Sequence, residues 1–183
     1  MIKAFRYVSF FLIIFIQLSF LLAIFYEEID TFWIGLFIAV ISILISIGYY
    51  HAPRAEENHF IEDCFLIVFV VAGALSTYFC STQLNFGPVI AASGVGFFAS
   101  FLPIFNRKSP ILKELPEAVY CGAFVGMTAP KVAAGIPFIL FAGFLTGVIL
   151  LLSKNVFNGF GGKLGTIAFG GVALTSLLIF LIF

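Results

Sequence analysis

The sequence predicts an all-α, polytopic integral membrane protein with about seven transmembrane helices, and its composition and charge distribution carry this prediction. Of the 183 residues, 62% are hydrophobic and 10% are charged, whereas about 25% of the residues of a soluble domain are charged. The nine basic and nine acidic residues are confined to a few short segments. A span needs roughly 20 mainly apolar residues. Charge-free stretches of that length or more occupy 7–26, 31–50, 64–106, 132–153 and 164–183.

The first predicted span, about 7–26, follows two basic residues, Lys3 and Arg6. A basic start before an apolar run is also typical of a signal peptide. This run, however, ends in "LLAIFYEEID" and has no small-residue cleavage site. We therefore predict a first span that is retained in the protein.

The remaining spans are separated by short polar segments. These are the acidic "EEID", the polar "STQLN" and the basic "NRKSPILKELPE" (106–117). The longest polar stretch, "HAPRAEENHFIED" (51–63), is too short to bury a core. Residues 1–183 are thus predicted to form a single transmembrane domain with no soluble domain. The expected later spans are about 31–50, 62–80, 86–105, 134–153 and 164–183.

The segment 118–137 leaves two topologies open. It is either a short fifth span or a re-entrant or broken element, which would leave six spans. Basic residues favour the cytoplasmic side. With seven spans and a cytoplasmic N-terminus, Lys131 alone of the nine basic residues lies outside. With six spans Lys131 moves inside, whereas Lys154 and Lys163 move outside. The charge distribution therefore favours seven.

A weak internal repeat links 65–102 with 138–178. Each copy has an apolar span, a short polar turn that contains Asn85 or Asn158, a Phe-Gly pair and a Gly/Ala/Ser-rich span. An odd number of crossings between the copies would give the inverted repeat that is common in transporters. The alternative is that any two Gly/Ala-rich apolar hairpins resemble each other.

The glycine run "FNGFGGKLGTIAFGG" (157–171) fails as a nucleotide-binding loop. A phosphate loop requires Gly at 157 and Ser or Thr at 164, where this chain has Phe157 and Leu164. The net charge of zero also gives no reason to expect nucleic acid. Small residues four apart instead predict close helix packing, or close approach to a solute. Such pairs are Gly161/Gly165, Gly122/Gly126, Gly143/Gly147 and Gly96/Ser100.

Lys163 stands at the threshold of the last span and has two interpretations. It is a snorkelling lysine that anchors the helix end, or a cation beside a helix N-terminus that attracts an anion. Asn158 and Thr166 are nearby polar residues that fit the second interpretation.

The other candidates also have alternative interpretations. Pro130 and Lys131 belong either to a loop or to a discontinuous element that lines a cavity. Glu117 is either a favourable charge at a helix start or a gating carboxylate. His59, Glu62 and Asp63 form a weak candidate metal corner, but no second His at i+4 and no Cys ligand accompanies them. We expect a solvated loop there and no cofactor.

The expected function is a small channel or transporter of the cytoplasmic (inner) membrane for an ion or small solute. HExxH, GxSxG and paired intramembrane Asp are absent from the sequence, so we do not expect an enzyme. The alternative is a non-conducting structural or accessory subunit of a membrane complex. The expected partners are the lipid bilayer and either further copies of the chain or another membrane protein. The candidate pathway residues are Lys163, Asn158, Thr166, Gly161, Gly162, Gly165, Ser93, Lys131, Pro130 and Glu117.

Overall fold

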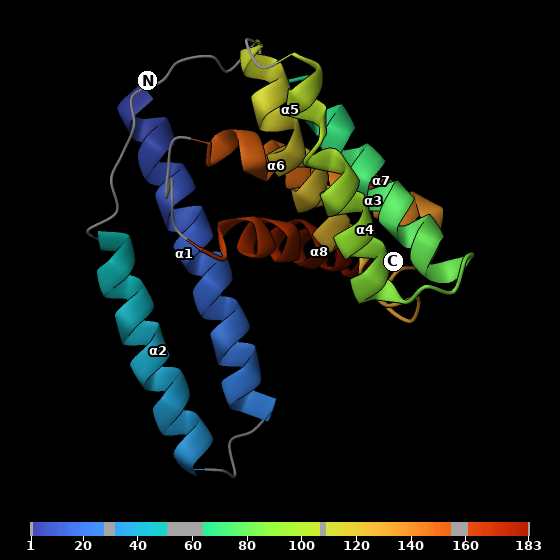
Figure 1. The fold of residues 1–183 in the computed structure, drawn as a ribbon. Coiled ribbons are helices and arrows are strands. Elements are labelled where there is room, and N and C mark those ends of the chain that lie inside the picture. Colours follow the sequence, from blue (N-terminus) through green and yellow to red (C-terminus); the bar gives the residue numbers. More distant parts are fainter. Residues whose placement is uncertain (1, 28–31, 51–63, 107–108, 155–160, 183) are drawn as a thin grey trace. The chain divides into compact units, whose positions relative to one another are not determined.

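The computed structural model describes residues 2–27, 32–50, 64–106, 109–154 and 161–182, and these residues form helices and turns (Figure 1). The prediction of an all-α chain is confirmed for this part. Seven helices have twelve residues or more, and α5 (Leu102–Phe105) is a single turn. The seven are α1 (Ile2–Glu27), α2 (Phe32–Tyr50), α3 (Leu66–Thr82), α4 (Pro88–Ala99), α6 (Pro110–Gly126), α7 (Ile136–Leu152) and α8 (Lys163–Ile182).

The helices are apolar and much of their apolar surface is exposed. By length and composition, Pro88–Phe105 and Lys163–Ile182 could each cross a membrane among the described residues. Four further apolar helices are shorter: Phe10–Tyr26, Phe32–Gly48, Leu66–Thr82 and Ile136–Leu152.

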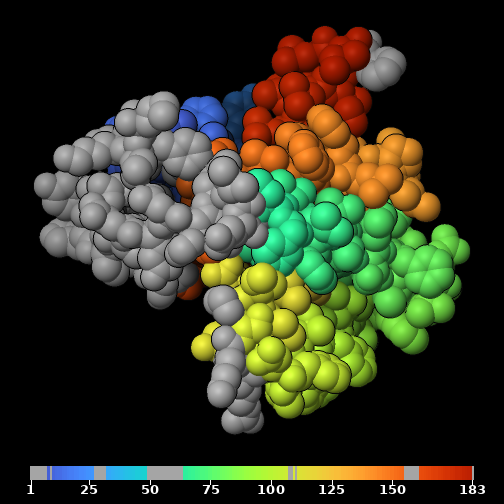
Figure 2. Space-filling model, turned by 90° about the horizontal axis from the view of Figure 1, so that it is seen from above, coloured from blue at the N-terminus to red at the C-terminus, as the bar shows by residue number. Residues whose placement is uncertain are grey.

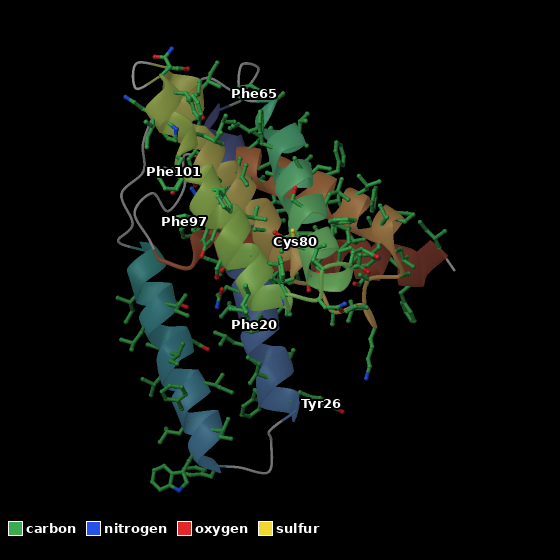
Figure 3. The ribbon with its side chains drawn as sticks, turned by 45° about the vertical axis from the view of Figure 1, so that its right-hand side comes forward. Phe20, Tyr26, Phe65, Cys80, Phe97 and Phe101 are labelled. Atoms are coloured by element: carbon green, nitrogen blue, oxygen red, sulfur yellow. The ribbon has the colours of Figure 1, made fainter. Side chains whose placement is uncertain are left out.

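Aromatic side chains contribute to this exposed surface. Phe97 and Phe101 both project outward, with ring centroids 5.0 Å apart in an edge-to-face arrangement (Figure 3). Large exposed apolar side chains cluster in water-soluble proteins only where a partner covers them. This surface is therefore suited to lipid or to another protein.

The chain divides into two compact units, which are described separately. The first comprises Met1–Glu57 and Leu152–Gly161, and the second Asn58–Leu151 and Gly162–Phe183. In the first unit, α1 contacts α2. The ring of Phe25 covers Gly35 so closely that a Cβ at Gly35 would lie 2.9 Å from Cε2 of Phe25.

In the second unit, α6 is the helix that joins the others. It contacts α3, α4, α5 and α8, and α3, α4 and α6 lie side by side (Figure 1). Seen from above, α7 (orange) lies between α8 (red) and α3 (green) in Figure 2. Contacts at glycines explain how these helices come so close.

The α3–α6 contact is a contact between backbones. A Cβ added to Gly122 would overlap the carbonyl oxygen of Val70, and one added to Gly126 would overlap that of Ala74. In the other direction, a Cβ at Gly73 would overlap the carbonyl oxygen of Val119. The prediction that Gly122 and Gly126 form a packing face is confirmed.

Glycines also form the α3–α7 contact, and they fix the relative direction of the helices. A Cβ at Gly143 would lie 3.3 Å from Cα of Val71, and one at Gly147 would lie 2.9 Å from Cγ2 of Ile67. From the first contact to the second, the residue number rises along α7 and falls along α3, so the two helices are antiparallel. By the same comparison α3 and α6 are parallel, because Val70 meets Gly122 and Ala74 meets Gly126.

The structure corrects the expected connection at 106–117, because α6 already begins at Pro110. Ser109 caps the helix and its hydroxyl accepts a hydrogen bond from the Leu112 amide at 3.4 Å. Pro110 occupies the first turn, where its missing N–H costs nothing. The helix continues through Pro116 and ends at Gly126. The break expected within 118–137 is thus the turn over 127–135.

The backbone contact yields the first prediction. Gly122→Ala should lower the free energy of unfolding in detergent by about 1–3 kcal/mol, because its Cβ forces α3 and α6 apart. Gly94 on α4 is the matched control, since a Cβ there meets nothing within 4 Å. Gly94→Ala should be neutral or stabilise by up to about 1 kcal/mol through helix propensity. Thermal unfolding of the two variants measures the difference, and equal midpoints would contradict this account.

Candidate functional site

The first residue of α8, Lys163, is buried, with 7% of its surface exposed. The residue before it, Gly162, has φ +84°, a conformation that favours glycine. This turn directs the chain into α8. The next residue, Leu164, is tied to α6, because the thiol of Cys121 donates a hydrogen bond to its carbonyl oxygen at 3.6 Å. The first turn of α8 is therefore fixed against α6.

Glu117 belongs to the same junction. It lies four residues before Cys121, so the two share one face of α6. Glu117 is exposed, whereas Cys121 and Lys163 are buried. The structure thus brings the helix that carries Glu117 and Cys121 against the first turn of α8. The spacing of Glu117 and Lys163 along the sequence does not predict this contact.

The first turn of α8 is otherwise lined by small residues. The hydroxyl of Thr166 donates to the Gly162 carbonyl oxygen at 3.2 Å, and its backbone N–H does so at 3.0 Å. A Cβ at Gly161, Gly162 or Gly165 would meet nothing within 4 Å. Unlike Gly122 and Gly126, these glycines therefore contact no described part of the chain closely. The packing seam expected at Gly161 and Gly165 would require a neighbour from another chain, a solute or lipid.

The remaining candidates lie elsewhere or outside the described residues. Ser93 is exposed on α4, and Pro130 and Lys131 are exposed in the turn that follows α6. Within the described ranges no three His, Cys, Asp or Glu side chains are grouped to hold a metal ion. Asn158 and the candidate metal corner of His59, Glu62 and Asp63 lie outside these ranges.

Two buried hydroxyls are further polar features that the sequence analysis missed. Thr77 and Thr146 are fully buried, and neither Oγ1 atom has a hydrogen-bond partner among the residues that the structure describes. Thr146 faces α8, where a Cβ on Gly171 would overlap its Oγ1. By contrast, the Thr175 hydroxyl donates to the Gly171 carbonyl oxygen at 2.8 Å. A threonine between two glycines of a packing face, as at 143–147, is the signal that could have identified Thr146.

The junction can bind charge, but it does not present a nucleophile. Cys121 is buried and its thiol is engaged by a backbone carbonyl. A buried ammonium beside a helix start can attract a negative group, and a nearby carboxylate can compete with that group. The arrangement is therefore suited to recognising or compensating charge. No protein-family model, curated protein or solved structure matches this chain.

The Thr146–Gly171 contact yields the second prediction. Gly171→Ala should destabilise the protein by roughly 1–3 kcal/mol, because the added methyl group overlaps Thr146. Adding Thr146→Ala should relieve at least half of that loss, since it removes the overlapping hydroxyl. Gly165→Ala on the same helix is the control, because its Cβ meets nothing. Unfolding of the parent, Gly171→Ala, Thr146→Ala and the double variant gives the coupling, and strictly additive losses would refute the contact.

Proposed function

We propose that the chain is a polytopic protein of the cytoplasmic membrane, with seven spans and a cytoplasmic N-terminus, that forms a small channel or transporter. The observation that carries the conduction proposal is Lys163, a buried cation at the start of an apolar helix beside open glycines. Ionisable groups within membrane helices are rare and mark solute routes.

The exposed apolar surface supports the membrane environment. On α4, Phe97 and Phe98 are 61% and 73% exposed, and on α8 Phe180 is 81% exposed. The core helix of a soluble protein would bury such rings. In hydrocarbon they face a solvent as apolar as themselves, which removes the cost of exposing them.

The directions of α3, α6 and α7 support seven spans. With seven, the third and fifth spans run the same way and the sixth runs against them. With six spans and a re-entrant element at 118–137, the chain would return to the cytoplasmic side before α7, and α7 would run parallel to α3. The glycine contacts make α7 antiparallel to α3 and α6 parallel to it, as seven spans require.

The same directions support the inverted repeat of 65–102 and 138–178. The leading helices of the two copies, α3 and α7, run in opposite directions. The second helix of each copy begins after a glycine with positive φ, Gly87 at +79° and Gly162 at +84°. A shared start of this kind fits two copies of one hairpin in opposite orientations.

The proposed pathway runs along the first turn of α8, where open space lies beside Gly162 and Gly165. Lys163 gives this route a preference for an anion or a carboxylate-bearing solute. A chain of 183 residues would conduct as a homo-oligomer. The open surfaces at Gly94 and Gly165 are the places where a second copy could approach.

Those open surfaces also favour one alternative, a non-conducting accessory subunit. Helices of a larger complex would then pack on Gly94 and Gly165 and leave no route for a solute. The two proposals differ in what fills that space, and a flux measurement distinguishes them.

The seven-span topology is the third prediction. In a variant without the native cysteines, Lys131→Cys should react with a membrane-impermeant maleimide added outside, and Lys154→Cys should react only after the membrane is opened. The six-span arrangement requires the reverse labelling. Reaction of both positions from the same side would contradict both topologies.

The pathway is the fourth prediction. Purified protein in liposomes should conduct a small anion. Lys163→Ala should reverse or abolish the preference for anions, and Gly165→Leu should reduce flux at least about tenfold by filling the space along α8. Phe180→Leu, at the exposed far end of α8, should leave flux unchanged. Absence of flux for a panel of ions and small solutes would support the accessory subunit instead.

A further inference from the structure

Aromatic residues with a polar edge gather at the ends of the two helices of the first unit. Helices α1 (Ile2–Glu27) and α2 (Phe32–Tyr50) contain the single tryptophan of the chain and four of its six tyrosines. Neither residue type occurs in 8–25 or in 34–48. All five lie within two turns of a helix end, at Tyr7, Tyr26, Trp33, Tyr49 and Tyr50.

Two of these residues flank the connection between the helices. Tyr26 is 79% exposed at the end of α1 (Figure 3), and Trp33 is 74% exposed at the start of α2. The helices run antiparallel (Figure 1), and their ends meet here because the ring of Phe25 covers Gly35. Phe32 packs edge-to-face on Trp33, with ring centroids 5.8 Å apart. One end of this helical hairpin therefore presents both polar aromatic rings outward.

Exposed side chains in the middle of the hairpin have a different chemistry. Phe15 on α1 is 71% exposed, and Ile43 on α2 is 59% exposed. The exposed hydroxyls of Ser19 and Ser46 each donate to a carbonyl oxygen of their own helix, at 2.7 Å. These groups suit lipid chains, because they are hydrocarbon or already hydrogen-bonded. The ends of the hairpin differ, since an indole N–H or a phenol O–H needs a polar acceptor.

We propose that Tyr26 and Trp33 anchor the α1–α2 hairpin in the headgroup and ester region of the bilayer, on the side opposite the N-terminus. The inference rests on the proposed membrane location of the chain. In that region the ester and phosphate oxygens accept hydrogen bonds from the indole and the phenol, while the bodies of the rings face the acyl chains.

Helix length and charge agree with this placement. The apolar parts of the two helices, Phe10–Tyr26 and Phe32–Gly48, each extend about 25 Å at the helical rise. The hydrocarbon core is about 30 Å thick, so an anchor at one end brings the other end close to the opposite interface. The connecting sequence "EEID" contains no basic residue, whereas Lys3 and Arg6 belong to the start of α1. This distribution of charge places the connection on the non-cytoplasmic side.

The single tryptophan makes the anchor measurable without an added label. The full-length protein is reconstituted in phosphatidylcholine vesicles whose acyl chains carry bromine either near the ester or near the terminal methyl group. Bromine quenches an indole only at short range. The shallow bromine should quench Trp33 at least about twofold more strongly than the deep bromine, because the ring lies at the interface. Moving the indole to the other helix, with Tyr26→Trp and Trp33→Phe, should give the same order.

Phe15→Trp combined with Trp33→Phe is the matched control. Phe15 and Trp33 are almost equally exposed, but Phe15 lies about 16 Å along α1 from Tyr26 at the helical rise. Its replacement should be quenched more strongly by the deep bromine, since that position lies in the hydrocarbon. Exposure alone would give both positions the same order.

The anchor is overturned if the shallow bromine quenches Trp33 no more than the deep one. It is also overturned if acrylamide in the water quenches Trp33 and neither bromine does. Flotation of the protein with the vesicles is measured in the same samples. A chain that does not float would refute the membrane location as well, whereas a floating chain with the wrong order of quenching refutes the anchor alone.

Discussion

The close approach of the α3 and α6 backbones is the constraint on which the second unit depends. In the proposed membrane environment lipid would supply no hydrophobic drive for helix association, so the helices would associate through tight packing and polar contacts. Gly73, Gly122 and Gly126 leave no room for a Cβ between the two helices. Any side chain there would separate α6 from α3. It would also shift the face of α6 that carries Glu117 and Cys121, and with it the contact to α8.

Glycines on α7 and α8 make close helix contacts of the same kind, and these contacts also determine the directions of the helices. Gly143 and Gly147 let α7 pack antiparallel against α3. Gly171 of α8 packs against Thr146 of α7. Each contact pairs a missing side chain with a specific neighbour, so each fixes register as well as distance. Helix directions that hydropathy alone leaves open are therefore determined by where these glycines lie.

Much of the fold could be predicted from the sequence, but the site could not. Charge-free stretches located α1, α2, α7 and α8 closely, because these four helices are built almost wholly from apolar residues. The start of α6 differs from the prediction, because Lys113, Glu114 and Glu117 indicate a polar connection, whereas Ser109 caps a helix that runs through them. Glycine spacing predicted the packing at 122 and 126, but it could not show that 161 and 165 stay open. The burial of Lys163 depends on tertiary packing, which the order of residues along the chain does not reveal.

Some glycines pack against a neighbouring helix, whereas others lie beside open space. This contrast bears on the environment of Glu117. Its carboxylate is exposed within the chain, about 10 Å along α6 from Pro110 at the usual helical rise. Lipid at that position would leave the charge without solvation, and a packed apolar helix would do the same. Water can stabilise it. The exposed Glu117 on α6 therefore fits a hydrated surface better than a dry seam between subunits.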